Sequence, residues 1–117
     1  TYLIVSKYGA NRLTDVTWSN ATFTEAYLPA KAEMETIITN LWEDSSSRQW
    51  KIFSDGSSTS SNWDYYWTAT ADDADSSKAY YASVTTNSNV TGTYAGLVTS
   101  TKNKTETLKA IGVSYIK

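Results

Sequence analysis

The stretch from Ala30 to Trp42, AKAEMETIITNLW, decides the fold class. Its apolar residues recur at the spacing of one face of an α-helix. They are Met34, Ile37, Ile38, Leu41 and Trp42. Pro29 precedes the stretch, where proline presets φ and lacks an N–H that the first helical turn would leave unpaired. We therefore predict one main helix over residues 30–42, with its apolar stripe in the core.

Segments rich in β-branched and aromatic residues follow this helix and are separated by turns of Asp, Ser, Asn and Gly. They cover residues 65–70, 79–84, 94–99 and 110–116. Such a succession indicates an antiparallel sheet. Residues 2–5 and 16–18 predict two short strands ahead of the helix, and residues 50–53 are either a strand or a packed loop. One helix beside a run of strands makes the fold class α+β.

Length and charge restrict the function. The 117 residues fit a single domain, 1–117, with one hydrophobic core. Ten basic and twelve acidic side chains give a net charge of −2, which leaves no basic surface for nucleic acid. No run approaches the roughly 20 apolar residues that a membrane helix needs, so we expect no membrane insertion of this domain.

The side chains of common enzyme active sites are missing. There is no His and no Cys, so the usual base near neutral pH and the thiol nucleophile are absent. Paired carboxylates remain, either Glu33 with Glu35 or the aspartates at 72, 73 and 75. The aspartates lie between two predicted strands, where a solvated turn is the simpler interpretation. We expect a protein that is not an enzyme.

Four motifs occur in an order that resembles a known group. They are YLPAKAEM at 27–34, YWTAT at 66–70, AYY at 79–81 and GVSYIK at 112–117. They resemble bacterial C-type-lectin-like domains of the Fibrobacter major paralogous and Lcl C-terminal types, which also end fimbrillin-like Bacteroides surface proteins. That group reads W-R-L-P-T-x-x-E, Y-W-S-S-T, A-W-Y and V-R-C-V-R. The resemblance implies a C-type-lectin-like fold with one helix on a mostly antiparallel sheet.

This chain departs from the group at two informative positions. Ala30 stands where the group has a helix-capping Thr, so Glu33 keeps only half of a capping box. Tyr115 stands where the group has Cys, so no disulfide forms there. The resemblance hardly covers residues 1–23. They either pair with the C-terminal strand, since C-type-lectin-like folds bring their termini together, or belong to a linker.

The resemblance implies a non-enzymatic binding or adhesion module at the cell surface or outside the cell, within a larger surface chain. Loops rich in Ser, Thr and Asn, in a chain without Cys, agree with export. The ligand would be a glycan or a protein. The alternative is a structural or assembly domain of a fimbrial or lipoprotein chain, with no soluble ligand.

The candidate ligand contacts are aromatic side chains that can stack on a sugar or a peptide, together with nearby carboxylates. They are Trp50, Trp63, Asp64, Tyr65, Asp72, Asp73 and Asp75. Alternation along the strand would turn Tyr66 outward if Trp67 points into the core.

Calcium is the cofactor that the aspartates in this set suggest. Asp72, Asp73 and Asp75 offer the hard oxygen ligands that C-type lectins use for calcium. The chain lacks the E-P-N or Q-P-D motif of sugar-binding C-type lectins, and Asn62-Trp63-Asp64 has the letters of W-N-D in another order. We therefore expect no cofactor and no metal, with calcium as the alternative.

Overall fold

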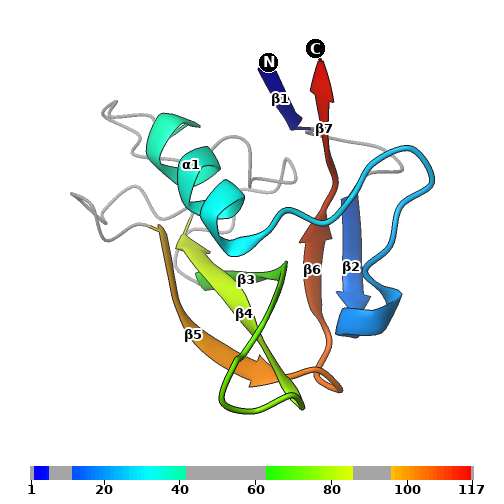
Figure 1. The fold of residues 1–117 in the computed structure, drawn as a ribbon, viewed down its shortest axis with the longest axis vertical. Helices are drawn as coiled ribbons and strands as arrows, with labels where there is room; N and C mark the ends of the chain where they lie inside the picture. Colours follow the sequence, from blue (N-terminus) through cyan, green and yellow to red (C-terminus); the bar gives the residue numbers. More distant parts are fainter. Residues whose placement is uncertain (1, 6–11, 42–62, 86–95, 117) are drawn as a thin grey trace.

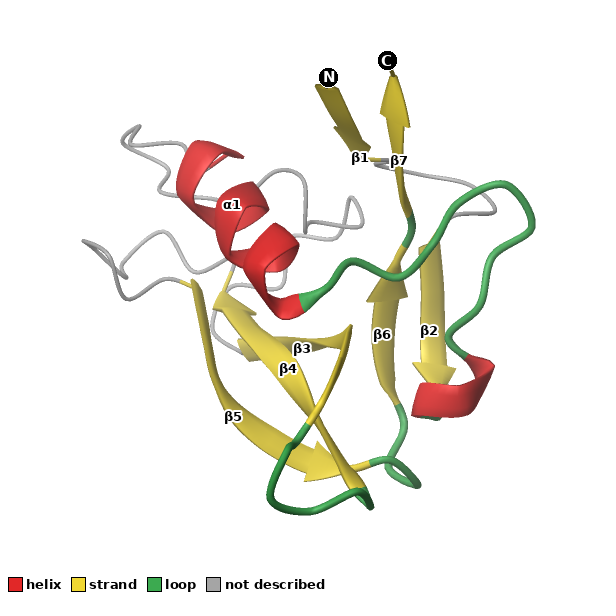
Figure 2. Cartoon of the chain, viewed as in Figure 1, coloured by secondary structure: helices red, strands yellow, loops and turns green. Residues whose placement is uncertain are grey.

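The computed structural model describes residues 2–5, 12–41, 63–85 and 96–116 (Figure 1). The elements in chain order are β1 (Tyr2–Val5), β2 (Arg12–Val16), the 3-10 helix η1 (Trp18–Asn20), α1 (Lys31–Leu41), β3 (Trp63–Ala71), β4 (Lys78–Thr85), β5 (Gly96–Asn103), β6 (Leu108–Ile111) and β7 (Val113–Ile116). One α-helix beside two sheets confirms the α+β class (Figure 2). The predicted segment 50–53 lies outside the described residues.

The main sheet has five strands in the order β2-β6-β3-β4-β5. Its neighbouring strands are antiparallel except for β3 and β6, which are parallel. β1 pairs antiparallel with β7 in a separate two-stranded sheet, so the ends of the chain lie side by side (Figure 1). This pairing confirms that the N-terminal residues join the C-terminal strand, which is one of the two alternatives left open by the sequence.

The predicted helix is confirmed over Lys31–Leu41. Two side chains accept hydrogen bonds from backbone N–H groups at its start. Oε1 of Glu33 accepts a hydrogen bond from the Ala30 N–H at 2.8 Å, which is the half of a capping box that the sequence retains. The Lys31 N–H donates to Oγ1 of Thr70 on β3, at 2.9 Å. Thr70 on the sheet therefore accepts an N–H of the first helical turn, as the missing capping residue would.

Both faces of the sheet around β3 are covered. On one face, α1 packs on the sheet through a cluster of buried residues. These are Met34, Ile37, Ile38, Tyr66, Ala82, Val84, Val98, Ile111 and Val113. On the other face a second cluster forms where residues 13–28 cross β3, β4 and β6. Its buried members are Ala21, Trp67, Ala79, Leu108 and Ala110, with Leu13, Val16, Trp18, Phe23, Leu28 and Tyr81 packed against them.

This two-sided core corrects one prediction. Trp67 points inward as expected, with none of its surface exposed, but Tyr66 is also buried, at 1% exposure. Alternation does send the two rings to opposite faces. The helix α1 covers one face of the sheet and residues 13–28 cover the other, so neither ring reaches solvent.

Two strand boundaries also differ from the sequence prediction. The strand expected at 16–18 lies earlier, as β2, and Trp18 begins η1 instead. The segment 110–116 forms two strands that are separated at Gly112 and belong to different sheets. A Cβ at Gly112 would lie 3.0 Å from Cβ of Ala26 and 3.0 Å from Cγ of Phe23, so a side chain at this crossing point would press on both residues.

Candidate functional site

The predicted contact residues do not form one group. Trp63, Asp64 and Tyr65 begin β3, whereas Asp72, Asp73 and Asp75 lie in the turn after its far end. An extended strand rises about 3.3 Å per residue, so Tyr65 and Asp72 are far apart. Trp50 lies outside the described residues. Of this predicted set, the exposed ring of Tyr65 and the aspartate turn are the two features whose side chains the structure describes.

The Asp72 and Asp75 side chains are engaged in the β3–β4 turn, whereas Asp73 is exposed. Oδ1 of Asp72 accepts a hydrogen bond from the Ala74 N–H at 2.9 Å. Oδ1 of Asp75 accepts from the Ser77 hydroxyl at 2.6 Å and from the Ser77 N–H at 3.0 Å. These bonds, the hydroxyl's first, lower the pKa of Asp75. Within the described ranges, no three acidic side chains are grouped in a way that could hold a metal ion. The geometry is that of a self-satisfied turn.

The exposed ring of Tyr65 belongs to a surface that we name the aromatic–lysine surface, made of Tyr65, Tyr81 and Lys102. Tyr65 is 38% exposed. Its ring meets that of Tyr81 edge to face, with centroids 5.4 Å apart and planes at 85°. Nζ of Lys102 lies 5.2 Å from the Tyr65 centroid and 5.1 Å from the Tyr81 centroid. One ammonium group therefore contacts two aromatic rings.

Strand pairing explains why these three side chains meet. Tyr65 is opposite Ser83 on β4, and Tyr81 on β4 is opposite Ser100 on β5. Residues two apart on a strand share a face, so Tyr65, Tyr81 and Lys102 lie on the same side of the sheet. Tyr81 and Lys102 were not among the predicted contacts. Locating them requires the register of three strands, which the sequence alone does not supply.

Lys102 is also held by an acidic side chain. Its Nζ lies 3.8 Å from Oε1 of Glu106, in the turn between β5 and β6. The Glu106 N–H donates to the Asn103 carbonyl at 3.0 Å, which fixes the turn. The Lys102 and Glu106 side chains are 27% and 47% exposed. Solvent therefore reaches this ion pair.

A second cluster joins the helix start to β7. Tyr27 and Tyr115 stack with centroids 5.9 Å apart, and both hydroxyls donate to Oε2 of Glu33, that of Tyr27 at 2.9 Å. Burial acts to raise the pKa of Glu33, but hydrogen bonds from Tyr115, the Ala30 N–H and Tyr27 outweigh it and lower that pKa. The Tyr27 N–H and C=O also pair with Val113 on β7, both at 2.9 Å. This cluster anchors the segment before α1 to β7.

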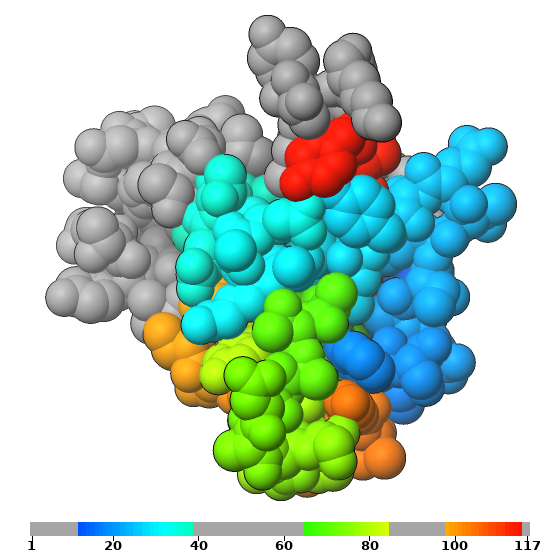
Figure 3. Space-filling view, viewed as in Figure 1, coloured from blue at the N-terminus to red at the C-terminus, as the bar shows by residue number. Residues whose placement is uncertain are grey.

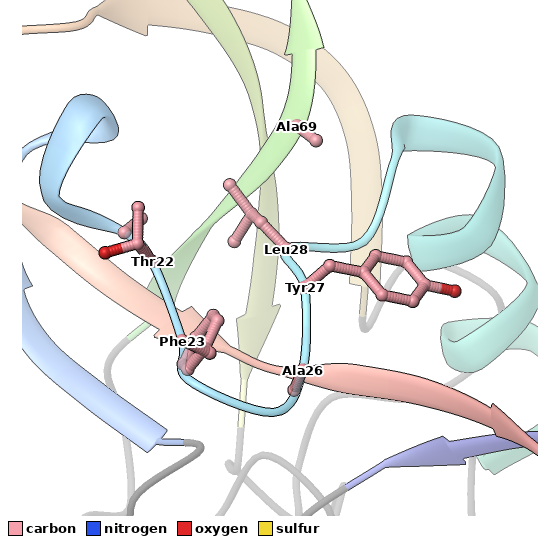
Figure 4. A pocket seen from close by; sticks show the side chains of 7 residues that line it. Thr22, Phe23, Ala26, Tyr27, Leu28 and Ala69 are labelled. Carbon is pink, nitrogen blue, oxygen red and sulfur yellow. The ribbon is translucent and has the colours of Figure 1, made fainter.

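An apolar pocket of about 360 Å³ opens beside this cluster (Figure 4). Its lining residues are Ala21, Thr22, Phe23, Ala26, Tyr27, Leu28 and Ala69. In Figure 4 the Tyr27 hydroxyl points away from the pocket, which leaves the Thr22 hydroxyl as the polar side-chain group of the lining. The Ala69 N–H donates to the Pro29 carbonyl at 2.8 Å, so the two walls are tied together. Figure 3 shows the segment before α1 as a continuous band of surface between β2 and the helix.

Comparison of the chain with family models, curated proteins and solved structures finds no match. The C-type-lectin-like resemblance therefore rests on the four sequence motifs. In the part of the chain that the structure describes, no helix has the length and apolar character needed to cross a membrane.

Proposed function

We propose that this chain is a non-enzymatic binding module of a bacterial cell-surface or secreted protein, with a C-type-lectin-like fold, and that it binds a glycan on the aromatic–lysine surface. The observation that carries this proposal is the Tyr65 ring, 38% exposed and held against Tyr81 on the face of a rigid sheet. Its position on a strand keeps the ring in one orientation, which lowers the entropy lost on binding.

A saccharide suits this surface chemically. The C–H groups of a sugar ring form a flat apolar face that can lie on a tyrosine ring, while its hydroxyls need hydrogen-bond partners. Ser100 is exposed and lies across from Tyr81, and Lys102 brings three N–H donors. An apolar platform with a few placed polar groups is the usual composition of a small-ligand site.

The engagement of the carboxylates supports a non-enzymatic role. Glu33 accepts hydrogen bonds from two phenols and a backbone N–H, and Asp72 and Asp75 stabilise their own turn. General acid–base catalysis needs a carboxyl group whose pKa lies near the working pH. The hydrogen bonds instead lower the pKa of Glu33 and of Asp75.

The test is isothermal titration calorimetry of the domain with a panel of host and bacterial oligosaccharides. Tyr65→Ala should weaken binding at least tenfold, the loss of about 1.4 kcal/mol, because it removes the exposed platform. Tyr115→Ala is the matched control, because that ring is 48% exposed but lies at the other cluster. No binding to any oligosaccharide, or equal binding by the Tyr65 variant, would contradict the proposal.

The second candidate is a structural or assembly domain, and the apolar pocket favours it. A pocket lined by Phe23, Leu28 and alanines suits an apolar side chain of a neighbouring chain better than a sugar hydroxyl. Ala69 is exposed at the pocket, so Ala69→Arg should fill it without disturbing the core. If assembly is the function, sedimentation velocity should detect self-association that Ala69→Arg abolishes and Tyr65→Ala leaves intact. A monomer at every concentration would exclude self-assembly through this pocket.

A further inference from the structure

We propose that the ligand of the aromatic–lysine surface is an acidic glycan, one that carries a carboxylate, and that Glu106 competes with this carboxylate for Lys102. The inference rests on the glycan-binding function proposed above and names its ligand class. It starts from the position of one ammonium group over two aromatic rings.

The first step is the distance from the ring platform to the charge. Nζ of Lys102 lies 5.2 Å from the Tyr65 centroid, which is less than the width of a sugar ring and its substituents. Because Nζ lies over the ring, a sugar that packs on Tyr65 is within reach of the Lys102 ammonium. A carboxylate at that position accepts a hydrogen bond from the ammonium in which both partners are charged, so it gains a Coulomb attraction that a neutral hydroxyl lacks.

The second step is that Lys102 can exchange its present partner. The Nζ to Oε1 distance to Glu106 is 3.8 Å, longer than a hydrogen bond, and the Glu106 side chain is 47% exposed. Exposed pairs of this kind contribute between about 0 and 1 kcal/mol. A ligand carboxylate at hydrogen-bond distance can replace Glu106 at little cost.

The third step is to find which charged side chains near β5 lie on the same face of the sheet as Lys102. Thr101 lies between Ser100 and Lys102, so its side chain points to the opposite face. Its hydroxyl donates to Oδ2 of Asp72 at 3.4 Å, which places that carboxylate on the side away from Lys102. Lys104, beyond the end of β5, lies over the Trp18 ring at 4.2 Å and adds positive charge nearby. Asp75 lies close enough to interact with Lys104, and Glu106 is the carboxylate that pairs with Lys102.

The experiment compares acidic and neutral ligands that differ in one group. The pairs are oligogalacturonate with its methyl ester, and 3′-sialyllactose with its methyl ester, titrated calorimetrically at low salt. At least one acid should bind at least tenfold more tightly than its neutral partner. Lys102→Gln should remove this difference, and Lys102→Arg should keep most of it. Lys31→Gln is the matched control, because that ammonium also lies over a tyrosine ring, 4.7 Å from the Tyr80 centroid, and pairs with Glu35, but it lies on the helix side of the sheet.

Glu106→Gln is the most discriminating variant, because the proposal predicts that it increases the affinity for the acidic ligand. Removing the competing carboxylate should strengthen binding of the acid about two- to fivefold, the equivalent of up to about 1 kcal/mol, and leave the neutral ligand unchanged. Equal binding of acid and neutral partners in both pairs overturns the inference while the glycan-binding function stands. Absence of binding to all four ligands and to the wider panel overturns both.

Discussion

Replacing Glu33 with glutamine should destabilise the fold and change its dependence on pH. Glu33 connects three segments, since its Oε1 accepts from the Ala30 N–H and its Oε2 accepts from the hydroxyls of Tyr27 and Tyr115. Glutamine keeps one acceptor oxygen, and its amide nitrogen cannot accept either phenol. The variant therefore keeps the bonds at one of the two oxygen positions and loses those at the other, either the Ala30 N–H bond or the two phenol bonds.

The magnitude follows from the exposure of each partner. Loss of a capping bond at a helix start costs about 1 kcal/mol. Tyr27 and Tyr115 are 37% and 48% exposed, so water can replace their partner. Each of their bonds is then worth about 0.5 kcal/mol or less, in line with exposed ion pairs. Whichever set is lost, the free energy of unfolding should fall by about 1 kcal/mol, which corresponds to a decrease of about 4 °C in Tm.

The sign of the pH effect follows from the lowered pKa of Glu33. Because that pKa lies below the ordinary 4.5, the unfolded chain takes up the proton first as pH falls. The stabilisation is fully present above the ordinary value and disappears as pH falls through the folded-state pKa. Glu33→Gln should therefore show a flatter decline in stability below about pH 4.5 than the wild type. The lowered pKa of Asp75 acts in both proteins and cancels.

Urea unfolding followed by circular dichroism, at pH 7 and in steps towards pH 3, measures both effects. Glu35→Gln is the control, because Glu35 makes an exposed ion pair with Lys31 at 3.8 Å and its loss should change stability by less than about 0.5 kcal/mol. Equal stability of Glu33→Gln and wild type at pH 7, with parallel acid curves, would refute the role assigned to this carboxylate.

Three further substitutions test the packing, each by urea unfolding. Trp67→Phe should cost about 2–4 kcal/mol, because it leaves a cavity and removes the bond from Nε1 to the Val16 carbonyl at 2.9 Å; a loss below about 1 kcal/mol would contradict this. Thr68→Val should cost about 1–3 kcal/mol, because the buried hydroxyl donates to the Tyr80 carbonyl at 2.9 Å, whereas Thr68→Ser should retain that bond. Gly112→Ala should cost about 1–3 kcal/mol, because its methyl group would lie 3.0 Å from Ala26 and Phe23; unchanged stability would show that this contact relaxes.

Local patterns predicted much of the fold. The 3.6-residue period placed α1 within one residue at its start, and the aromatic and β-branched runs identified β3 and β4. Long-range contacts decided the rest. The second cover on β3 comes from residues 13–28, so Tyr66 and Trp67 are both buried. The helix start depends on Thr70, which is 39 residues away from its partner Lys31.

The candidate surface was predictable only in part. Tyr65 could be named because it stands near polar residues at the start of an aromatic run. Tyr81 and Lys102 become its neighbours through the register of β3, β4 and β5, which depends on packing between distant segments. Of the three aspartates that suggested a calcium site, Asp72 and Asp75 accept hydrogen bonds within their own turn.

The most direct test of the central claim is an NMR titration of the assigned, isotope-labelled domain with the oligosaccharide that binds most tightly. Binding on the aromatic–lysine surface predicts saturable shifts of the backbone amides around Tyr65, Tyr81 and Lys102, with the amides of residues 21–28 unaffected. Shifts centred on the apolar pocket, or no shifts with any oligosaccharide, would contradict glycan binding on this face of the sheet.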